Sequence, residues 1–139
     1  MKCAEINDMI LVDSSVWIDY FNGIDNGQTN YLHAHLGVKN FATGDLILVE
    51  VLQGFRAEKD FKKARELLSD LYFFDMIGQD MAYKAALNYR ILKKRGFTIR
   101  KTIDVMIAIF CVENKLALLH NDRDFKATET VLELEVVKV

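Results

Sequence analysis

The chain has 139 residues, 51% of them hydrophobic, and its 18 lysines and arginines against 20 acidic residues give a net charge of −2. A chain of this length buries roughly 70% of its unfolded surface, which makes a core possible without disulfides or a structural metal. The near-neutral charge excludes a generally cationic nucleic-acid binder, and the 27% charged and 11% aromatic residues exclude a disordered chain.

The first half of the chain opens with a buried strand. Met9–Asp13 is an apolar run that ends on an acid, which is typical of a strand covered on both faces. We expect Ser14 or Ser15 to cap a helix over 16–21. The elements expected next are a helix at 29–36, a short strand at 40–42, a helix at 46–55 capped by Asp45, a helix at 57–71 and a strand at 72–76.

The second half continues the alternation of helices and strands. The pattern predicts a helix at 80–95 ended by Gly96, a very apolar helix at 103–114, a strand at 117–119, a short helix at 124–130 and an edge strand at 132–139. Such alternation predicts an α/β fold with a central, mostly parallel, twisted sheet and helices on both faces. Because no linker exceeds a turn and no repeat is present, we expect one domain over residues 1–139.

Acidic residues fall where such a fold places its ligand site. Asp13 ends the first strand and Asp122 follows the strand at 117–119, and in open α/β sheets ligands bind beyond the carboxyl ends of the strands. Glu50 lies inside an apolar helix, and Asp104 opens the most apolar helix of the chain. A carboxylate in such surroundings is destabilised by desolvation unless a cation meets it.

Each acid also has a purely structural explanation. Asp13 could cap the following helix, Glu50 could reach water at a helix edge, and Asp104 could be a first-turn acid stabilised by the helix dipole. Asp122 could be an ordinary turn residue. If the four meet, Arg123 is the only cation within these segments, and one charge cannot neutralise four. A hard divalent cation such as Mg²⁺ or Mn²⁺ would relieve the repulsion and could activate water for phosphodiester hydrolysis.

Four segments, in order along the chain, carry a resemblance to a known family. They are Met9–Phe21, the helix with Glu50 before Gln53–Gly54, Ile103–Asp104, and Leu119–Phe125. Together they resemble the PIN-domain ribonucleases and, more narrowly, the VapC toxins of bacterial and archaeal type II toxin–antitoxin pairs. The resemblance implies a PIN-like fold from about residue 9 to the C-terminus.

The resemblance also implies a catalytic site. An acidic quartet of Asp13, Glu50, Asp104 and Asp122 would hold one or two Mg²⁺ or Mn²⁺ ions, with Ser14 supporting the first metal ligand. Asp13 and Asp104 would be direct ligands. Glu50 would bind through water, or would orient or deprotonate the attacking water. The implied reaction is in-line hydrolysis of RNA that leaves a 5′-phosphate and a 3′-hydroxyl.

The fourth acidic position of the site can be assigned to more than one residue. Asp124 could stand beside Asp122 as a metal ligand or replace it, and His120 occupies a place where the family commonly has a small hydroxyl residue. A metal-free mechanism with paired histidines is disfavoured, because His33 and His35 are two residues apart on an expected helix and therefore diverge.

A basic segment precedes Asp104. Residues 90–101 contain six lysines and arginines and no acid, and Arg95, Arg100 and Lys101 are the candidates for contacts with RNA phosphates. The structural alternative is that cations near a helix C-terminus stabilise the helix dipole.

The resemblance implies protein partners as well. A cognate VapB-type antitoxin would place its C-terminal segment in a groove near the acids and insert a basic residue there. The toxin would form a homodimer and a hetero-oligomer with the antitoxin, which would itself bind operator DNA, so that this chain does not bind DNA directly. Trp17, Tyr20 and Phe21 are expected in the core or in the partner groove.

The sequence favours a cytoplasmic protein. The longest apolar runs, such as 105–112, are about half the length of a bilayer span, and Met1–Val12 carries charges where a signal peptide would be apolar. Cys3 and Cys111 lack ligand spacing and are expected to be free thiols.

Two other classes of function compete. A receiver-type phosphoryl-transfer domain would use Asp75 as acceptor, although no suitably placed lysine follows a strand. A non-catalytic interaction module would keep the fold and use only the basic segment.

Overall fold

A four-stranded parallel sheet forms the centre of the computed structural model, which describes residues 8–139. Its strands are β1 (Ile10–Val12), β2 (Phe41–Gly44), β3 (Tyr72–Phe74) and β4 (Ala117–Leu119). They lie in the order β3-β2-β1-β4, and every neighbouring pair is parallel. The predicted α/β fold with a parallel sheet is confirmed, and β1 and β4 are neighbours, so their carboxyl ends meet at one edge.

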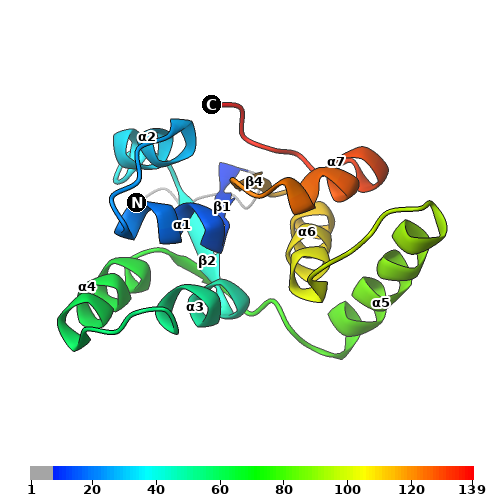
Figure 1. The fold of residues 1–139 in the computed structure, drawn as a ribbon, viewed down its shortest axis with the longest axis horizontal. Helices are drawn as coiled ribbons and strands as arrows, with labels where there is room; N and C mark the ends of the chain where they lie inside the picture. The colour runs from blue at the N-terminus through cyan, green and yellow to red at the C-terminus, as the bar shows by residue number, and fades with distance from the viewer. Residues whose placement is uncertain (1–7) are drawn as a thin grey trace.

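Helices cover both faces of this sheet. The helices are α1 (Ser14–Phe21), α2 (Gly27–His35), α3 (Asp45–Leu52), α4 (Glu58–Ser69), α5 (Gln79–Lys94), α6 (Thr102–Asn114) and α7 (Lys126–Leu132). Figure 1 shows α1, α2 and α4 on the left of the strands, α3 below β2, and α5 to α7 on the right, and helices contact one another within the group α1 to α4 and within the group α5 to α7. No helix within residues 8–139 is long and apolar enough to cross a membrane.

The core forms around β1, whose three apolar residues are all buried between β2 and β4. Trp17 of α1 and Phe125 are also fully buried. Helix α6 is apolar almost all round because it packs on β4 while α5 and α7 cover it from outside. Cys111 of α6 is a buried free thiol, whereas Cys3 lies outside the described residues.

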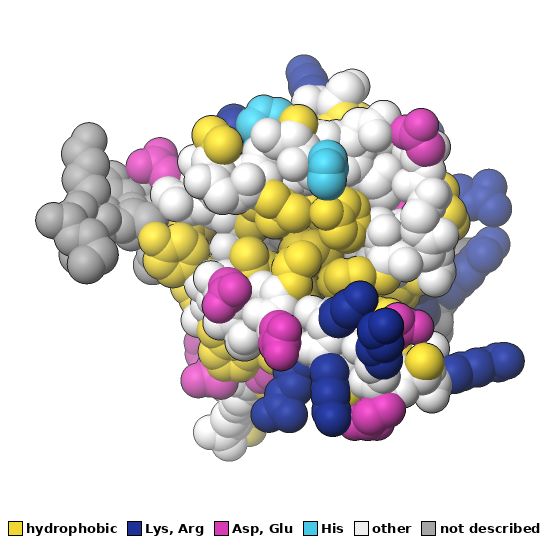
Figure 2. Space-filling view, turned by 90° about the vertical axis from the view of Figure 1, so that its left-hand side faces the viewer, with side chains coloured by type: hydrophobic (Ala, Val, Ile, Leu, Met, Phe, Trp, Pro, Cys, Tyr) yellow, Lys and Arg dark blue, Asp and Glu magenta, His cyan; other side chains and the backbone are white. Residues whose placement is uncertain are grey.

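The face made by α1 to α4 has an apolar groove. Figure 2 shows hydrophobic side chains gathered in the middle of this face, with lysines and arginines along its lower part. Side chains of α1 and α3 and of the turn after α3 line the groove: Ile18, Phe21, Asn22, Val51, Gly54 and Phe55. Trp17 lies beneath, stacked on Phe21 with ring centroids 5.7 Å apart. Trp17 thus lies in the core and Phe21 lines the groove.

The start of α1 differs from the prediction. Asp13, rather than Ser14 or Ser15, is the N-cap, because its backbone is still extended and its Oδ2 accepts a hydrogen bond of 3.0 Å from the Ser15 amide. The structural explanation offered for Asp13 is thus correct, but it employs only one of the two carboxylate oxygens.

The start and end of α3 also differ. Gly44 is the N-cap, and Asp45 is the first helical residue, with its Oδ1 accepting hydrogen bonds from the amides of Leu46 and Met76. Asp45 therefore fixes the chain after β3 to the start of α3. The helix ends at Leu52, three residues before the predicted end, because the chain turns at Gly54.

The predicted edge strand at 132–139 is wrong in extent. Helix α7 continues to Leu132, and Glu133 adopts a left-handed conformation that ends it. A single parallel bridge joins Leu118 to Val136, with backbone hydrogen bonds to Leu118 from either side. The short helix predicted at 124–130 is a 3-10 helix, Arg123–Phe125, followed by α7.

Gly44 generates a prediction about packing. A Cβ atom at this position would collide with the Met76 side chain and would lie 2.9 Å from the Phe74 carbonyl oxygen. We expect Gly44→Ala to lower the free energy of unfolding by about 1–3 kcal/mol in urea titrations. Gly54→Ala is the control, because its nearest atom, the Val51 carbonyl oxygen, is 3.6 Å away. Equal stability of the two variants would contradict the packing argument.

Candidate metal centre

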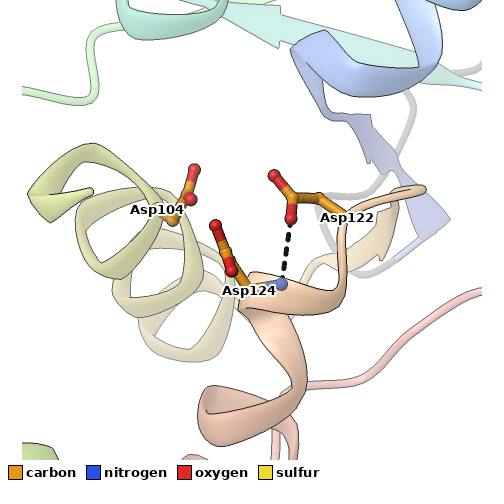
Figure 3. Close-up of side chains that lie close together, drawn as sticks. All are labelled: Asp104, Asp122 and Asp124. Atoms are coloured by element: carbon orange, nitrogen blue, oxygen red, sulfur yellow. Dashed lines mark hydrogen bonds between the residues drawn. The ribbon is translucent and has the colours of Figure 1, made fainter. Parts of the chain in front are cut away.

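Three carboxylates converge beyond the ends of the strands. Asp104 comes from the first turn of α6, Asp122 from the loop after β4, and Asp124 from the 3-10 helix. One oxygen of each lies within 4.8 Å of the others, and Figure 3 shows the three side chains pointing toward one another. The Asp124 amide donates a hydrogen bond of 2.9 Å to Asp122 Oδ1, which holds the two loop residues together.

Asp13 lies beside this group with one oxygen available. The residue is 2% exposed, and its Oδ1 has no hydrogen-bond partner among the described residues. Burial raises the pKa of Asp13 against the hydrogen bonds from Ser15, and the Asp122 carboxylate raises it further. A buried, unpartnered carboxylate oxygen is destabilising unless something positive meets it.

Glu50 stands at the margin of the same centre. It is half-buried on α3, and its Oε1 accepts a hydrogen bond of 3.0 Å from the Ser14 hydroxyl. Burial is the main reason why the pKa of Glu50 is raised, and repulsion from Asp13 and Asp122 adds to it. Ser14 therefore contacts Glu50, whereas the Ser15 amide holds Asp13. Glu50 is within electrostatic range of the acids but outside the group of three.

Lys101 is the cation that faces these acids. Its Nζ lies 3.5 Å from Asp104 Oδ2 and 3.3 Å from Asp122 Oδ2, whereas Arg123, the cation expected from the sequence, forms no ion pair within residues 8–139. Desolvation lowers the pKa of Lys101, but the carboxylates of Asp104 and Asp122 more than offset it, so the pKa is raised. The sequence suggests Lys101 only as a contact for RNA phosphates; its ion pairs with Asp104 and Asp122 were not predicted, although it precedes Asp104 by only three residues.

The pKa of Asp104 shows that Lys101 alone does not neutralise the surrounding carboxylates. Burial raises the pKa of Asp104 to about 7, Lys101 opposes the shift, and Asp13, Asp122 and Glu50 add to it. Its Oδ2 has no hydrogen-bond partner among the described residues, because Lys101 is paired at ion-pair distance only. The donor set consists of carboxylate oxygens with buried unpartnered atoms, which fits a hard divalent cation.

The remaining predicted residues are not in the group of three acids. Arg95 and Arg100 are exposed in the segment between α5 and α6. His33 and His35 belong to α2, where their Nδ1 atoms contact the Tyr20 hydroxyl and the Tyr31 carbonyl oxygen.

The excess of carboxylates over cations at this site predicts how the stability of the metal-free protein depends on pH. Asp104 ionises near its ordinary value of 3.8 in the unfolded chain but near 7 in the fold, so its contribution to stability is lost as pH rises through this range. In chelator, we expect Asp104→Asn to raise the Tm, by roughly 5 °C at pH 8 and by less at pH 5. Thermal melts at both pH values check this. A lower Tm for the variant at pH 8 would mean that Asp104 is paired structurally.

Replacing Lys101 should have the opposite effect on the stability of the metal-free protein. Its replacement leaves the carboxylates without their cation, so Lys101→Met should lower the stability of the metal-free protein by about 1 kcal/mol. Lys94→Met, at an exposed position on α5, is the control. In the background of Asp104→Asn the loss should shrink, because one of the two ion pairs is already gone. Additive effects in urea titrations of the four variants would contradict the coupling.

Solved structures share this fold. VapBC2 from Rickettsia felis, solved bound to a DNA fragment of its promoter, matches with a TM-score of 0.73 and 16% identity, covering 93% of this chain and 97% of that one. DNA-bound VapBC from Salmonella typhimurium matches with a TM-score of 0.72 and 15% identity, covering 93% and 96%.

Sequence comparison gives the family. The chain is 24% identical over 130 residues to ribonuclease VapC11 of Mycobacterium tuberculosis, which covers 91% of this chain and 96% of the relative. The family model of the PIN domain matches residues 10–131, which hold all four segments of the resemblance except the first residue. The chain therefore belongs to the PIN-domain family, as its sequence motifs predicted.

Proposed function

We propose that this chain is a metal-dependent endoribonuclease and the toxin of a toxin–antitoxin pair. The observation that carries the proposal is the convergence of Asp104, Asp122 and Asp124 beside the unpartnered oxygen of Asp13 in a PIN domain. Similarity to VapC ribonucleases over 91% of the chain supports RNA as the substrate. We further propose that the single domain spans residues 1–139 and acts in the cytoplasm.

The acids have different roles in this proposal. Asp13 and Asp104 would hold Mg²⁺ or Mn²⁺ directly, with Asp122 as the third ligand and Asp124 beside it or in its place. Glu50, oriented by the Ser14 hydroxyl, would accept a proton from the attacking water or hold that water in line with the phosphorus. The bound ion would supply an activated water and stabilise charge on the phosphoryl group. The products would be a 5′-phosphate and a 3′-hydroxyl.

Basic side chains would position the RNA. Arg95 and Arg100 are exposed on the segment that leads into α6, and Lys101 already lies at the acids. Contacts from these residues to phosphates would fix the strand over the carboxylates without selecting a base sequence.

An antitoxin would occupy the apolar groove between α1 and α3. The groove passes Phe21 and Phe55 and continues toward Arg56, Asp60 and Lys63, so it offers both apolar and charged contacts to an extended peptide. The structural relatives from Rickettsia felis and Salmonella typhimurium are VapBC complexes, which supports a VapB-type antitoxin as the partner. We also propose a toxin homodimer within such a complex, with DNA bound by the antitoxin.

Loss of single metal ligands is the test of the activity. We expect Asp13→Asn and Asp104→Asn each to reduce the rate of cleavage of total cellular RNA by at least about 100-fold, because metal and nucleophile are lost while an amide still fits the pocket. Asp25→Asn, at an exposed position between α1 and α2, is the control and should cleave at the wild-type rate.

The same experiment includes a binding measurement. Mg²⁺ should raise the Tm of the wild-type protein and of Asp25→Asn by mass action, and should leave Asp13→Asn almost unchanged. Wild-type cleavage rates in both ligand variants would refute the proposed site. Identical wild-type melting curves in EDTA and in excess Mg²⁺ would refute its metal dependence.

A further inference from the structure

The loop between β4 and α7 carries two of the converging acids and is anchored at its first residues. The Asn121 amide donates to Ser15 Oγ at 3.1 Å, and the Asn121 side-chain amide donates to Asp19 Oδ2 at 3.2 Å. Both contacts tie the loop to α1. Neither reaches Asp122, so the backbone of that residue is held by something else.

His120 provides that contact. Its Nδ1 lies 3.1 Å from the Asp122 amide nitrogen, and its Nε2 lies 2.7 Å from Glu129 Oε1 on α7. The ring also packs on the buried Phe125, with centroids 4.7 Å apart, and its side chain is only 11% exposed. Each ring nitrogen therefore has a hydrogen-bond partner, one in the loop after β4 and one on α7, in addition to the packing of the ring on Phe125.

The partners determine which nitrogen carries the hydrogen. A backbone amide can only donate, so Nδ1 must be the acceptor and Nε2 must carry the hydrogen that Glu129 receives. Glu129 thus selects the tautomer that can hold the Asp122 amide. The chain of contacts runs from α7 through the imidazole to a residue whose carboxylate meets Asp124 and Lys101.

We propose that His120 is a positioning residue for the metal centre: its Nδ1 fixes the backbone of Asp122, and Glu129 fixes the tautomer of the ring. The inference rests on the proposed function, because it concerns Asp122 as a metal ligand. The hydrogen bond of His120 toward the centre goes to the backbone amide of Asp122, not to a carboxylate oxygen, so His120 would act on the metal through the position of Asp122. Contacts of this kind behind a metal ligand are typically worth 10- to 100-fold in metal affinity.

Two amide substitutions separate the roles of the two nitrogens. His120→Asn places a carbonyl oxygen near the position of Nδ1 and keeps an acceptor for the Asp122 amide. His120→Gln reaches toward Glu129 from the position of Nε2 and leaves the Asp122 amide without its acceptor. A role in packing alone would favour glutamine, whose volume is closer to that of histidine.

The measurement is the Mn²⁺ dissociation constant, by calorimetry on the full chain. We expect His120→Asn to stay within about threefold of the wild type and His120→Gln to bind Mn²⁺ at least about 10-fold more weakly. Glu129→Gln keeps an acceptor and should resemble the wild type, whereas Glu129→Leu should weaken binding. Equal affinities for His120→Asn and His120→Gln would overturn the proposal.

Amide hydrogen exchange in chelator provides a readout that needs no metal. The Asp122 amide should exchange slowly in the wild type and in His120→Asn, and at least about 10-fold faster in His120→Gln. Equal exchange in the two variants would overturn the positioning role even if both fold. A wild type that binds no Mn²⁺ and cleaves no RNA would instead refute the proposed function, and the exchange data would still decide what His120 holds.

Discussion

Repulsion among carboxylates dominates the region where β1 and β4 end. The fold buries Asp13 and Asp104 almost completely and brings Asp122 and Asp124 against Asp104, and within residues 8–139 only the Lys101 ammonium group lies at ion-pair distance from them. The apolar packing of β1 and α6 has to hold this charge in place, because the acids themselves oppose the folded state at neutral pH. A divalent cation would reverse the sign of that contribution, so the same residues that weaken the metal-free domain would stabilise the loaded one.

The sequence predicted the frame of this arrangement because its determinants are local. A run of apolar residues ending at Asp13 specifies a buried strand, and parallel neighbours place the ends of β1 and β4 together whatever lies between them. An acid in the first turn of the most apolar helix has to be buried with that helix. That Asp104 joins Asp13 in one site was implied only by the family resemblance, and the family model matches the same stretch of chain.

What the sequence did not predict depends on contacts across the fold. The choice of Asp13 over Ser14 or Ser15 as the cap depends on the backbone angles at the end of β1, and a serine next to an aspartate gives no signal for them. The ion pair of Lys101 with Asp122 spans 21 residues. The C-terminal residues alternate like a strand, but only Leu118 offers them a bridge, so regular pairing stops there.

Asp13 is shared between two parts of the molecule. One oxygen caps the start of α1, and the other is buried without a hydrogen-bond partner among the described residues, while the opposite end of the same helix supplies Phe21 to the apolar groove. In the proposed function, α1 would thus have a metal ligand at its N-cap and, at its last residue, a side chain that contacts the antitoxin peptide. A partner that shifted α1 along its axis would move the Asp13 carboxylate as well. It would inhibit the proposed nuclease without entering the metal centre.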